Sequence, residues 1–466
     1  MTRTVVVGLG RSGIGAARLL QARGHSVTIL ESQAGNEQRQ RAQPLRDQGI
    51  EVQLGRPLTL SSFEPWLDCL NAVVVSPGID WNHPTLEELR QRSITVLGEM
   101  ALAWQAMGRA PWIGITGTNG KTTVTQLLQH VLSEGGLNAP MAGNVGHSAA
   151  ELALSLNDAI RTGGPCAVPD WVVMEMSSYQ IEAAAVVSPR IGIWTTLTPD
   201  HLERHGTLAS YRSIKRGLLE RSQLRIFNAD DPDLRSHRSS WDHGLWVSAN
   251  GAGDGTTAMD LWCDAEGVVH SRRLGPLFPA SVLAMPGDHN RQNLLMVTAA
   301  ALEAGLTPQV IAAALRSFPG VPHRLEYLGK LAGMAVYNDS KATNFDAATV
   351  ALRSVPSPTV VLAGGQTKQG DPSEWLRLMG QQSCAAVLYG SGAEELAALL
   401  QASAYPGSME RCQDLDAAVP IALELGRRQQ ARSLLLSPAC ASFDQYRDFE
   451  ARGEHFRTLI SSRLNA

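Results

Sequence analysis

The stretch GITGTNGKTT, residues 114–123, has the spacing of a phosphate-binding loop: an apolar strand, a glycine-rich turn and a Lys-Thr pair that opens a helix. The helix that follows is amphipathic, with apolar residues at 124, 127, 128, 131 and 132. In such a turn the backbone N–H groups cradle phosphates, the lysine reaches the outer phosphates and the threonine hydroxyl ligates Mg²⁺. The predicted phosphate loop consists of Gly117, Thr118, Asn119, Gly120, Lys121, Thr122 and Thr123, with Thr122 on the metal. A turn with a solvated lysine is the alternative, and the coincidence of all three features argues against it.

A phosphate loop of this kind needs a carboxylate at the end of a neighbouring strand to help hold the metal. DWVVMEMSSYQ, residues 170–180, supplies Glu175 at the end of an apolar run. An acid at the end of a buried strand is rarely there for packing. We therefore assign Glu175 to Mg²⁺, against the alternative of an exposed glutamate at a strand end.

A second glycine-rich turn lies near the start of the chain, in VVVGLGRSGIGAARLL, residues 5–20. Its glycines follow a strand and open a helix, which brings a phosphate close to the helix N-terminus. Glu31 ends the next strand, where an acid would bind a ribose. Taken alone, this pattern fits a dinucleotide site, but it also fits a glycine-rich turn that binds another ligand or none.

The 466 residues are too many for one core and predict about three domains. Apolar strands alternate with helical stretches along the chain, which predicts an α/β protein with parallel sheets. We expect domains at residues 1–98, 99–320 and 321–466. The net charge of -4 gives no basic surface for nucleic acid. The six cysteines form no CxxC pair, and the N-terminus enters a strand directly, so we expect a cytoplasmic protein without a membrane span.

Several motifs together resemble the Mur ligases, ATP-dependent amide-forming enzymes of peptidoglycan synthesis. The motifs are GTNGKTT (117–123), GNVG (143–146), EMSSYQ (175–180), TPDHLERH (198–205), PHRLE (322–326), YNDSKATN (337–344) and LLSPACASFDQYRDFEARGEHF (435–456). Within the family, the C-terminal motifs are similar to those of members that add D-glutamate to UDP-N-acetylmuramoyl-L-alanine through an acyl phosphate and a tetrahedral intermediate. The resemblance implies an N-terminal Rossmann-like domain for UDP, a central phosphate-loop ATPase domain and a C-terminal Rossmann-like domain.

The resemblance also changes the interpretation of the first glycine-rich turn, which would hold the UDP of the substrate. It implies diphosphate contacts from Gly10, Arg11, Ser12 and Gly13, with Ser76 and Gly78 near the uridine. Asn144 would bind the lactyl-alanine portion. One departure from the family pattern is the lack of a basic residue soon after Glu31, since the next is Arg39.

Two further residues gain a role only through the resemblance. His201, which we expect at the end of a strand, would ligate a second Mg²⁺, whereas the residues alone favour a helix-capping or core histidine. Lys215 would be carbamylated and bind that metal, whereas the adjacent Arg216 favours a solvated helix face. Carbamylation needs a neutral amine, and therefore a partly buried lysine with a lowered pKa.

In the C-terminal part, the resemblance implies ATP contacts from Asn290, Arg324 and Asp339, with Asp339 on the ribose. Lys341 would face phosphate or the developing anion. The residues implied for D-glutamate are Thr343, Lys368, Ser442 and Phe449. We expect a monomer whose domains close over the substrates. Three alternatives stay open: a nucleotide-hydrolysing switch, an NAD-dependent oxidoreductase that uses the first loop, and a ligase for another amino acid.

Overall fold

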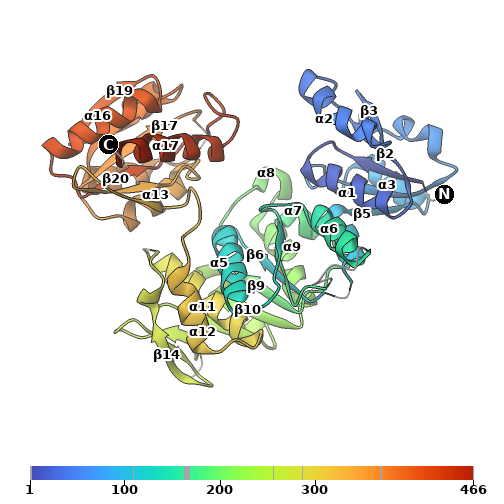
Figure 1. Ribbon diagram of the computed structural model, residues 1–466, viewed down its shortest axis with the longest axis horizontal. Coiled ribbons are helices and arrows are strands. Elements are labelled where there is room, and N and C mark those ends of the chain that lie inside the picture. Colours follow the sequence, from blue (N-terminus) through green and yellow to red (C-terminus); the bar gives the residue numbers. More distant parts are fainter. Residues whose placement is uncertain are drawn as a thin grey trace. The chain divides into compact units, whose positions relative to one another are not determined.

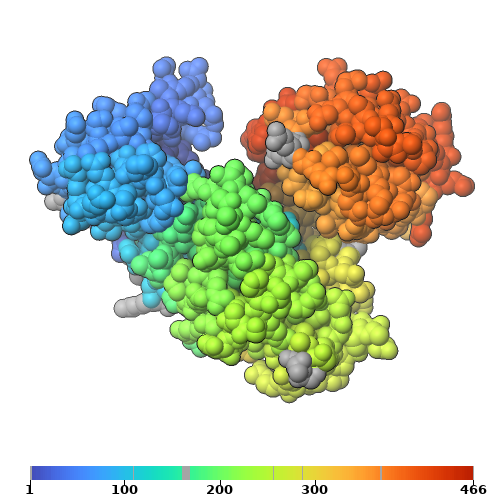
Figure 2. Space-filling model, turned by 180° about the vertical axis from the view of Figure 1, so that it is seen from behind, coloured from blue at the N-terminus to red at the C-terminus, as the bar shows by residue number. Residues whose placement is uncertain are grey.

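The computed structural model describes residues 3–108, 110–161, 168–254, 257–285, 287–367 and 370–464, which are coloured along the chain in Figure 1 and Figure 2. The chain divides into two compact units. One comprises residues 1–283 and 291–318, and the other comprises residues 284–290 and 319–466. Both contain mainly parallel sheets joined by helices, so the predicted α/β class is confirmed.

The first sheet occupies the N-terminal part of the first unit, in blue in Figure 1. Its parallel strands run in the order β3-β2-β1-β4-β5. They are β1 (Arg3–Val7), β2 (Ser26–Glu31), β3 (Glu51–Leu54), β4 (Leu70–Val75) and β5 (Thr95–Gly98). The helices are α1 (Arg11–Ala22), α2 (Asn36–Asp47) and α3 (Pro84–Gln91), with 3₁₀ turns η1 (Leu60–Ser62) and η2 (Glu64–Trp66). Buried residues cover both faces of β1, which explains its uninterrupted apolar run.

The second sheet follows helix α4 (Glu99–Ala106). Its strand order is β14-β13-β12-β11-β10-β9-β6-β8-β7, parallel from β7 to β12 and antiparallel beyond. The strands are β6 (Trp112–Thr116), β7 (Met141–Gly143), β8 (Val172–Glu175), β9 (Ile191–Trp194), β10 (Leu224–Asn228), β11 (Leu245–Ser248), β12 (Leu261–Cys263), β13 (Val268–Ser271) and β14 (Gly275–Pro279). The helices are α5 (Lys121–Glu134), α6 (Ala149–Arg161), α7 (Ser178–Glu182), α8 (Leu202–His205), α9 (Leu208–Arg221), α10 (Pro232–Ser236), α11 (Asp288–Glu303) and α12 (Pro308–Ser317), with η3 (Arg238–Ser240) and η4 (Ala280–Val282).

The two sheets of the first unit are joined through α1, α4 and α6, which share one apolar core. Gly15 allows this approach, because a Cβ there would lie 2.3 Å from Ser148 Oγ. Arg18 forms an ion pair of 3.0 Å with Glu151 across the same contact. Glu99 is buried and accepts the Ala150 N–H at 2.6 Å, at the start of α6. Burial raises the pKa of Glu99 to about 7, against the opposing effect of that hydrogen bond.

The second unit contains a sheet in the order β15-β16-β20-β17-β18-β19, parallel except between β15 and β16. Figure 2 shows this unit, coloured amber to red, as a closely packed body. Its strands are β15 (Glu326–Leu331), β16 (Met334–Asn338), β17 (Thr359–Gly364), β18 (Ser383–Tyr389), β19 (Ser408–Cys412) and β20 (Ser433–Leu436). Its helices are α13 (Phe345–Ser354), α14 (Ser373–Gln382), α15 (Ala393–Ala402), α16 (Leu415–Arg428) and α17 (Phe449–Leu464). Separate apolar cores cover the two faces of the sheet. Across the described residues, no helix is long and apolar enough to cross a membrane.

Candidate active site

The phosphate loop lies between the end of β6 and the start of α5, as the sequence predicts. Gly120 precedes α5 with a φ of +82°. Gly117 has a φ of +149°, and a Cβ there would lie 1.9 Å from Thr195 Oγ1. The segment after β9 holds the loop, because the Thr118 N–H donates to Thr196 O and the Asn119 N–H donates to Thr196 Oγ1, each at 2.9 Å. Thr122 and Thr123 occupy the first turn of α5.

Two lysines converge on a single backbone oxygen of this loop. Lys121 Nζ donates to Gly117 O and to Thr118 O at 2.8 Å each. Lys215 Nζ, from α9, donates to Gly117 O at 2.9 Å. The Lys215 side chain is fully buried, and its nitrogen lies 4.5 Å from the centre of the Tyr211 ring. Burial, reinforced by the nearby charge of Lys121, lowers the pKa of Lys215 well below its ordinary value.

Glu175 ends β8 beside β6 and is buried. Its Oε1 accepts the Asn144 side-chain N–H at 2.9 Å, and the Asn144 backbone N–H donates to Glu175 O at 3.0 Å. Its Oε2 is buried without a hydrogen-bond partner among the described residues. A buried carboxylate oxygen in this state fits a Mg²⁺ ligand. The described residues contain no cluster of three His, Cys, Asp or Glu side chains suited to a metal. This donor set suits Mg²⁺, which takes one or two carboxylates together with substrate phosphates.

The sequence predicts His201 at the end of a strand, and the structure does not place it there. Strand β9 ends at Trp194, and His201 precedes α8 in a left-handed conformation with a φ of 53°. Its half-exposed ring lies 3.5 Å from Asp200 Oδ2 and 5.2 Å from the ring of Tyr179. His205 is buried instead, with Nε2 at 2.9 Å from Ser178 Oγ.

The glycine-rich turn of the first sheet faces the same region. Gly10 precedes α1, and Arg11 and Ser12 begin that helix. Arg11 donates to Gly146 O at 2.9 Å, which links the turn to the GNVG segment. Gly13 has a packing role, since a Cβ there would lie 2.0 Å from Gly8 O.

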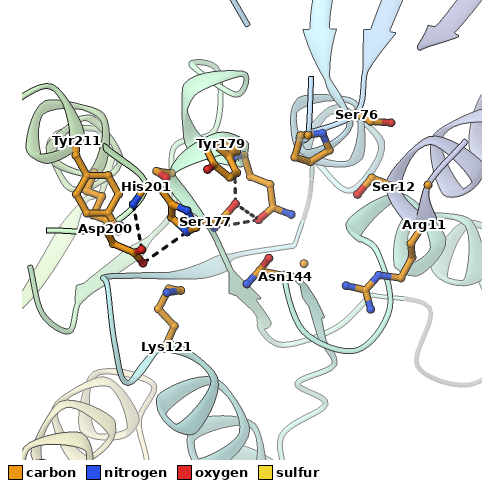
Figure 3. A pocket seen from close by; sticks show the side chains of 17 residues that line it. Arg11, Ser12, Ser76, Lys121, Asn144, Ser177, Tyr179, Asp200, His201 and Tyr211 are labelled. Carbon is orange, nitrogen blue, oxygen red and sulfur yellow. Dashed lines mark hydrogen bonds and ion pairs between the residues drawn. The ribbon is translucent and has the colours of Figure 1, made fainter. Parts of the chain in front are cut away.

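A cavity of about 520 Å³ joins the two loops. Its lining contains the predicted residues Gly10, Arg11, Ser12, Ser76, Gly78, Lys121, Asn144, His201 and Lys215. Figure 3 shows Arg11 and Ser12 at one end, Asp200 and Tyr211 at the other, and Asn144 between them. The cavity is also lined by residues that were not predicted: Ser177, Tyr179, Gln180, Asp200 and Tyr211. All of these except Tyr211 lie inside the EMSSYQ and TPDHLERH motifs, which could have pointed to them.

The residues predicted to contact ATP from the second unit include one buried acid, Asp339. Asp339, after β16, is buried and accepts the Leu325 N–H at 3.1 Å. Burial raises the pKa of Asp339 to about 7, although that hydrogen bond and the charge of Arg324 oppose the shift. Asn290, in the first turn of α11, is also buried and belongs to the segment that groups with this unit.

Among the other predicted residues of this unit, Lys341, Thr343 and Ser442 lie in loops after strands, and Phe449 begins α17. Lys341 Nζ lies 3.7 Å from the centre of the Phe449 ring. The Thr343 N–H donates to Lys341 O at 2.8 Å. Ser442 is buried, and its carbonyl oxygen accepts the Tyr446 N–H at 2.8 Å. Lys368 lies outside the described residues.

Comparison with known proteins matches the Mur ligase middle domain to residues 115–301, and the Mur ligase MurD-like N-terminal domain to residues 2–98. A curated protein from Prochlorococcus marinus (strain MIT 9313), named UDP-N-acetylmuramoylalanine--D-glutamate ligase, is 64% identical over 100% of both chains. The chain is a member of the Mur ligase family. Mur ligases of the same name from Synechococcus sp. (strain CC9605) and Microcystis aeruginosa (strain NIES-843 / IAM M-2473) are 62% and 44% identical, with coverage of at least 98% of each chain.

Solved Mur ligase structures share the fold. The UDP-N-acetylmuramate-alanine ligase of Thermotoga maritima superposes with a TM-score of 0.60 at 18% identity, over 99% of this chain and 100% of that one. A pseudomurein peptide ligase type C of Methanothermus fervidus gives 0.59 at 18%, with the same coverage. At this identity the likeness concerns the fold alone, and it confirms the predicted α/β architecture of a Mur ligase.

Because Gly117 lies against Thr195, any side chain at Gly117 should weaken nucleotide binding by the phosphate loop. In Gly117→Ala the new Cβ displaces the loop from Thr195 and shifts the amides that would hold the phosphates, so affinity should fall roughly tenfold, or about 1.4 kcal/mol. Calorimetric titration with a non-hydrolysable ATP analogue and Mg²⁺ measures the change. Gly136→Ala is the matched control, because Gly136 also has a positive φ but open space around it. Equal affinity in the two variants would contradict the steric argument.

Proposed function

We propose that this Mur ligase uses ATP to join D-glutamate to UDP-N-acetylmuramoyl-L-alanine. The observation that carries the proposal is the cavity that connects the first glycine-rich turn with the phosphate loop. A substrate with a diphosphate at one end and a carboxylate at the other suits such a cavity. The full-length similarity to curated ligases with this name supports the choice of substrates.

The proposed reaction has two steps. The substrate carboxylate takes the γ-phosphoryl group of ATP, which releases ADP and gives an acyl phosphate. The amine of D-glutamate then attacks the acyl carbon, and the tetrahedral intermediate loses a proton and phosphate to form the amide. Both steps gather negative charge, so the site must supply positive charge where it develops. Lys121 would contact the outer phosphates, and Mg²⁺ held by Thr122 and Glu175 would polarise the transferring group.

We propose that Lys215 is a ligand of a second metal ion. Its neutral amine would attack CO₂, form an N–C bond and release a proton, which turns the side chain into an anionic carbamate. The complete burial of Lys215 and the lowered pKa support this, because only the neutral amine reacts. His201 would complete the second Mg²⁺ site, and its place beside Asp200 in the cavity lining is compatible with that role.

At the other end of the cavity, the diphosphate would meet the N-terminus of α1. Gly10, Arg11 and Ser12 present that helix start to the cavity, and Ser76 and Gly78 line it beside them. Asn144 would hydrogen-bond the lactyl-alanine portion, and its tie to Glu175 would keep that portion near the metal.

The C-terminal unit would supply the amino-acid site and part of the ATP site. Asp339 would bind the ribose, Arg324 and Asn290 would contact ATP, and Lys341 would face the developing anion. Thr343, Lys368, Ser442 and Phe449 would hold D-glutamate. We propose that the chain works as a cytoplasmic monomer with domains at 1–98, 99–320 and 321–466, and that closure over the substrates protects the acyl phosphate from water.

The remaining alternatives fit the geometry less well. Glu31 would have to bind a ribose in an NAD-dependent enzyme, yet Oε2 already accepts the Leu9 N–H and Oε1 accepts the Gln33 N–H, both at 2.9 Å. A nucleotide-hydrolysing switch has no need for a cavity that reaches the N-terminal turn. A ligase for another amino acid shares the whole first unit, so only an acceptor test separates it from the proposal.

The acceptor test measures phosphate release from ATP with UDP-N-acetylmuramoyl-L-alanine present and one amino acid added at a time. D-Glutamate should stimulate release, whereas L-glutamate, L-alanine, L-lysine and meso-diaminopimelate should not. Release that does not depend on an acceptor would favour the switch. Stimulation by another amino acid alone would keep the ligase and replace D-glutamate.

The carbamate proposal predicts the behaviour of Lys215→Ala. Loss of a metal-supporting anion should lower turnover by on the order of a hundredfold. Formate or acetate should restore part of the activity, because a small carboxylate can occupy the space of the carbamate. The control is Arg216→Ala, which removes a neighbouring half-exposed cation that pairs with Glu220 and donates to Ser240. Full activity in Lys215→Ala would exclude this role for Lys215.

A further inference from the structure

Arg452, in α17, is a fully buried cation whose hydrogen-bond acceptors are neutral oxygens. Its side chain is 0% exposed and forms no ion pair with a carboxylate within the described ranges. A buried charge is costly unless it is paired or fully hydrogen-bonded. The guanidinium instead donates to neutral oxygen acceptors. We therefore look for its role in the segments that carry those acceptors.

Those acceptors belong to the ends of neighbouring strands in the second unit. Nε donates to Ser340 Oγ at 2.9 Å, and Nη2 donates to Ser340 O at 2.8 Å, in the loop after β16. Nη1 donates to Cys440 O at 3.1 Å, after β20, and to Gly364 O at 3.4 Å, at the end of β17. Strands β16, β20 and β17 are adjacent and parallel. One side chain therefore ties together the loops at the carboxyl ends of three neighbouring strands, where ligands bind in open α/β sheets.

The loops after β16 and β20 carry residues assigned above to D-glutamate or to the developing anion. Lys341 directly follows Ser340 in the chain, Thr343 comes three residues after Ser340, and Ser442 comes two residues after Cys440. Ser340 Oγ also donates to Phe449 O at 2.8 Å, at the start of α17, and the ring of Phe449 lies against Lys341 Nζ. Arg452 thus reaches Phe449 through Ser340 as well as through its own helix.

We propose that Arg452 is the positioning residue of the amino-acid site, fixing the loops after β16 and β20 and the start of α17 so that their side chains and amides converge on one dicarboxylate. The inference rests on the proposed function, because it takes these loops as the D-glutamate site. Its action requires a planar fork of donors, because Nε and Nη2 donate to Ser340 while Nη1 donates to Cys440 O. Lysine keeps the charge but offers three donors on a single nitrogen, so it cannot hold the same acceptors.

The test is Arg452→Lys in the full-length enzyme, with steady-state phosphate release measured against each substrate in turn. The KM for D-glutamate should rise by about tenfold or more, as expected for lost charge-assisted hydrogen bonds. The KM for UDP-N-acetylmuramoyl-L-alanine should stay within about twofold, because its assigned contacts lie in the first unit, away from these loops. Arg463→Lys is the control, since Arg463 lies near the end of the same helix and donates only to Leu459 O among the described residues.

Thermal unfolding checks that each variant is folded. If Arg452→Lys does not fold, Ser340→Ala decides the matter, because it removes the acceptor of Nε and the donor to Phe449 O without touching the charge. It should also raise the KM for D-glutamate selectively. An unchanged KM for D-glutamate, or equal losses for all three substrates, would overturn the positioning role. A wild-type enzyme that ignores D-glutamate would instead refute the proposed function.

Discussion

Gly117 O accepts hydrogen bonds from the side-chain nitrogens of both Lys121 and Lys215, and the rest of the site is arranged around this shared oxygen. Burial, together with the nearby charge of Lys121, lowers the pKa of Lys215 and favours its neutral amine. The charges of Asp200 and Glu175 act on Lys215 in the opposite direction. A nucleotide phosphate beside Lys121 would add the negative charge that a phosphate loop of this kind receives.

The sheet explains how the other groups reach this point. Strands β8, β6 and β9 are adjacent and parallel, so Glu175, the phosphate loop and the segment from Thr195 to Thr198 emerge at one edge. Asn144 follows β7 at the same edge and holds Glu175 by side chain and backbone. The contact between α1 and α6 then brings the first glycine-rich turn to the cavity. Ligand sites at the carboxyl ends of parallel strands are a general property of such sheets.

Local sequence was enough to predict the features that depend on local structure. The phosphate loop, the amphipathic α5 and the strand-end Glu175 follow from residue spacing, because a turn and its helix form from neighbours in the chain. The burial of Lys215 could not be predicted this way, since the adjacent Arg216 is consistent with an exposed helix face and only packing on β6 and Tyr211 decides which side is buried. The strand end predicted for His201 is wrong, because β9 stops at Trp194 and His201 precedes α8. Arg452 gave no signal either, because its acceptors come from loops about 12 to about 112 residues away in the chain.

The central claim is that Glu175 and the phosphate loop hold one magnesium-bound triphosphate. The most direct measurement is calorimetric binding of a non-hydrolysable ATP analogue, with and without Mg²⁺, to the wild type and to Glu175→Gln. The amide keeps the shape of the side chain and an oxygen for Asn144, but it removes the charge that faces the metal. The account predicts that Mg²⁺ strengthens binding to the wild type and that Glu175→Gln loses this gain while keeping its metal-free affinity. An undiminished gain in Glu175→Gln would contradict it.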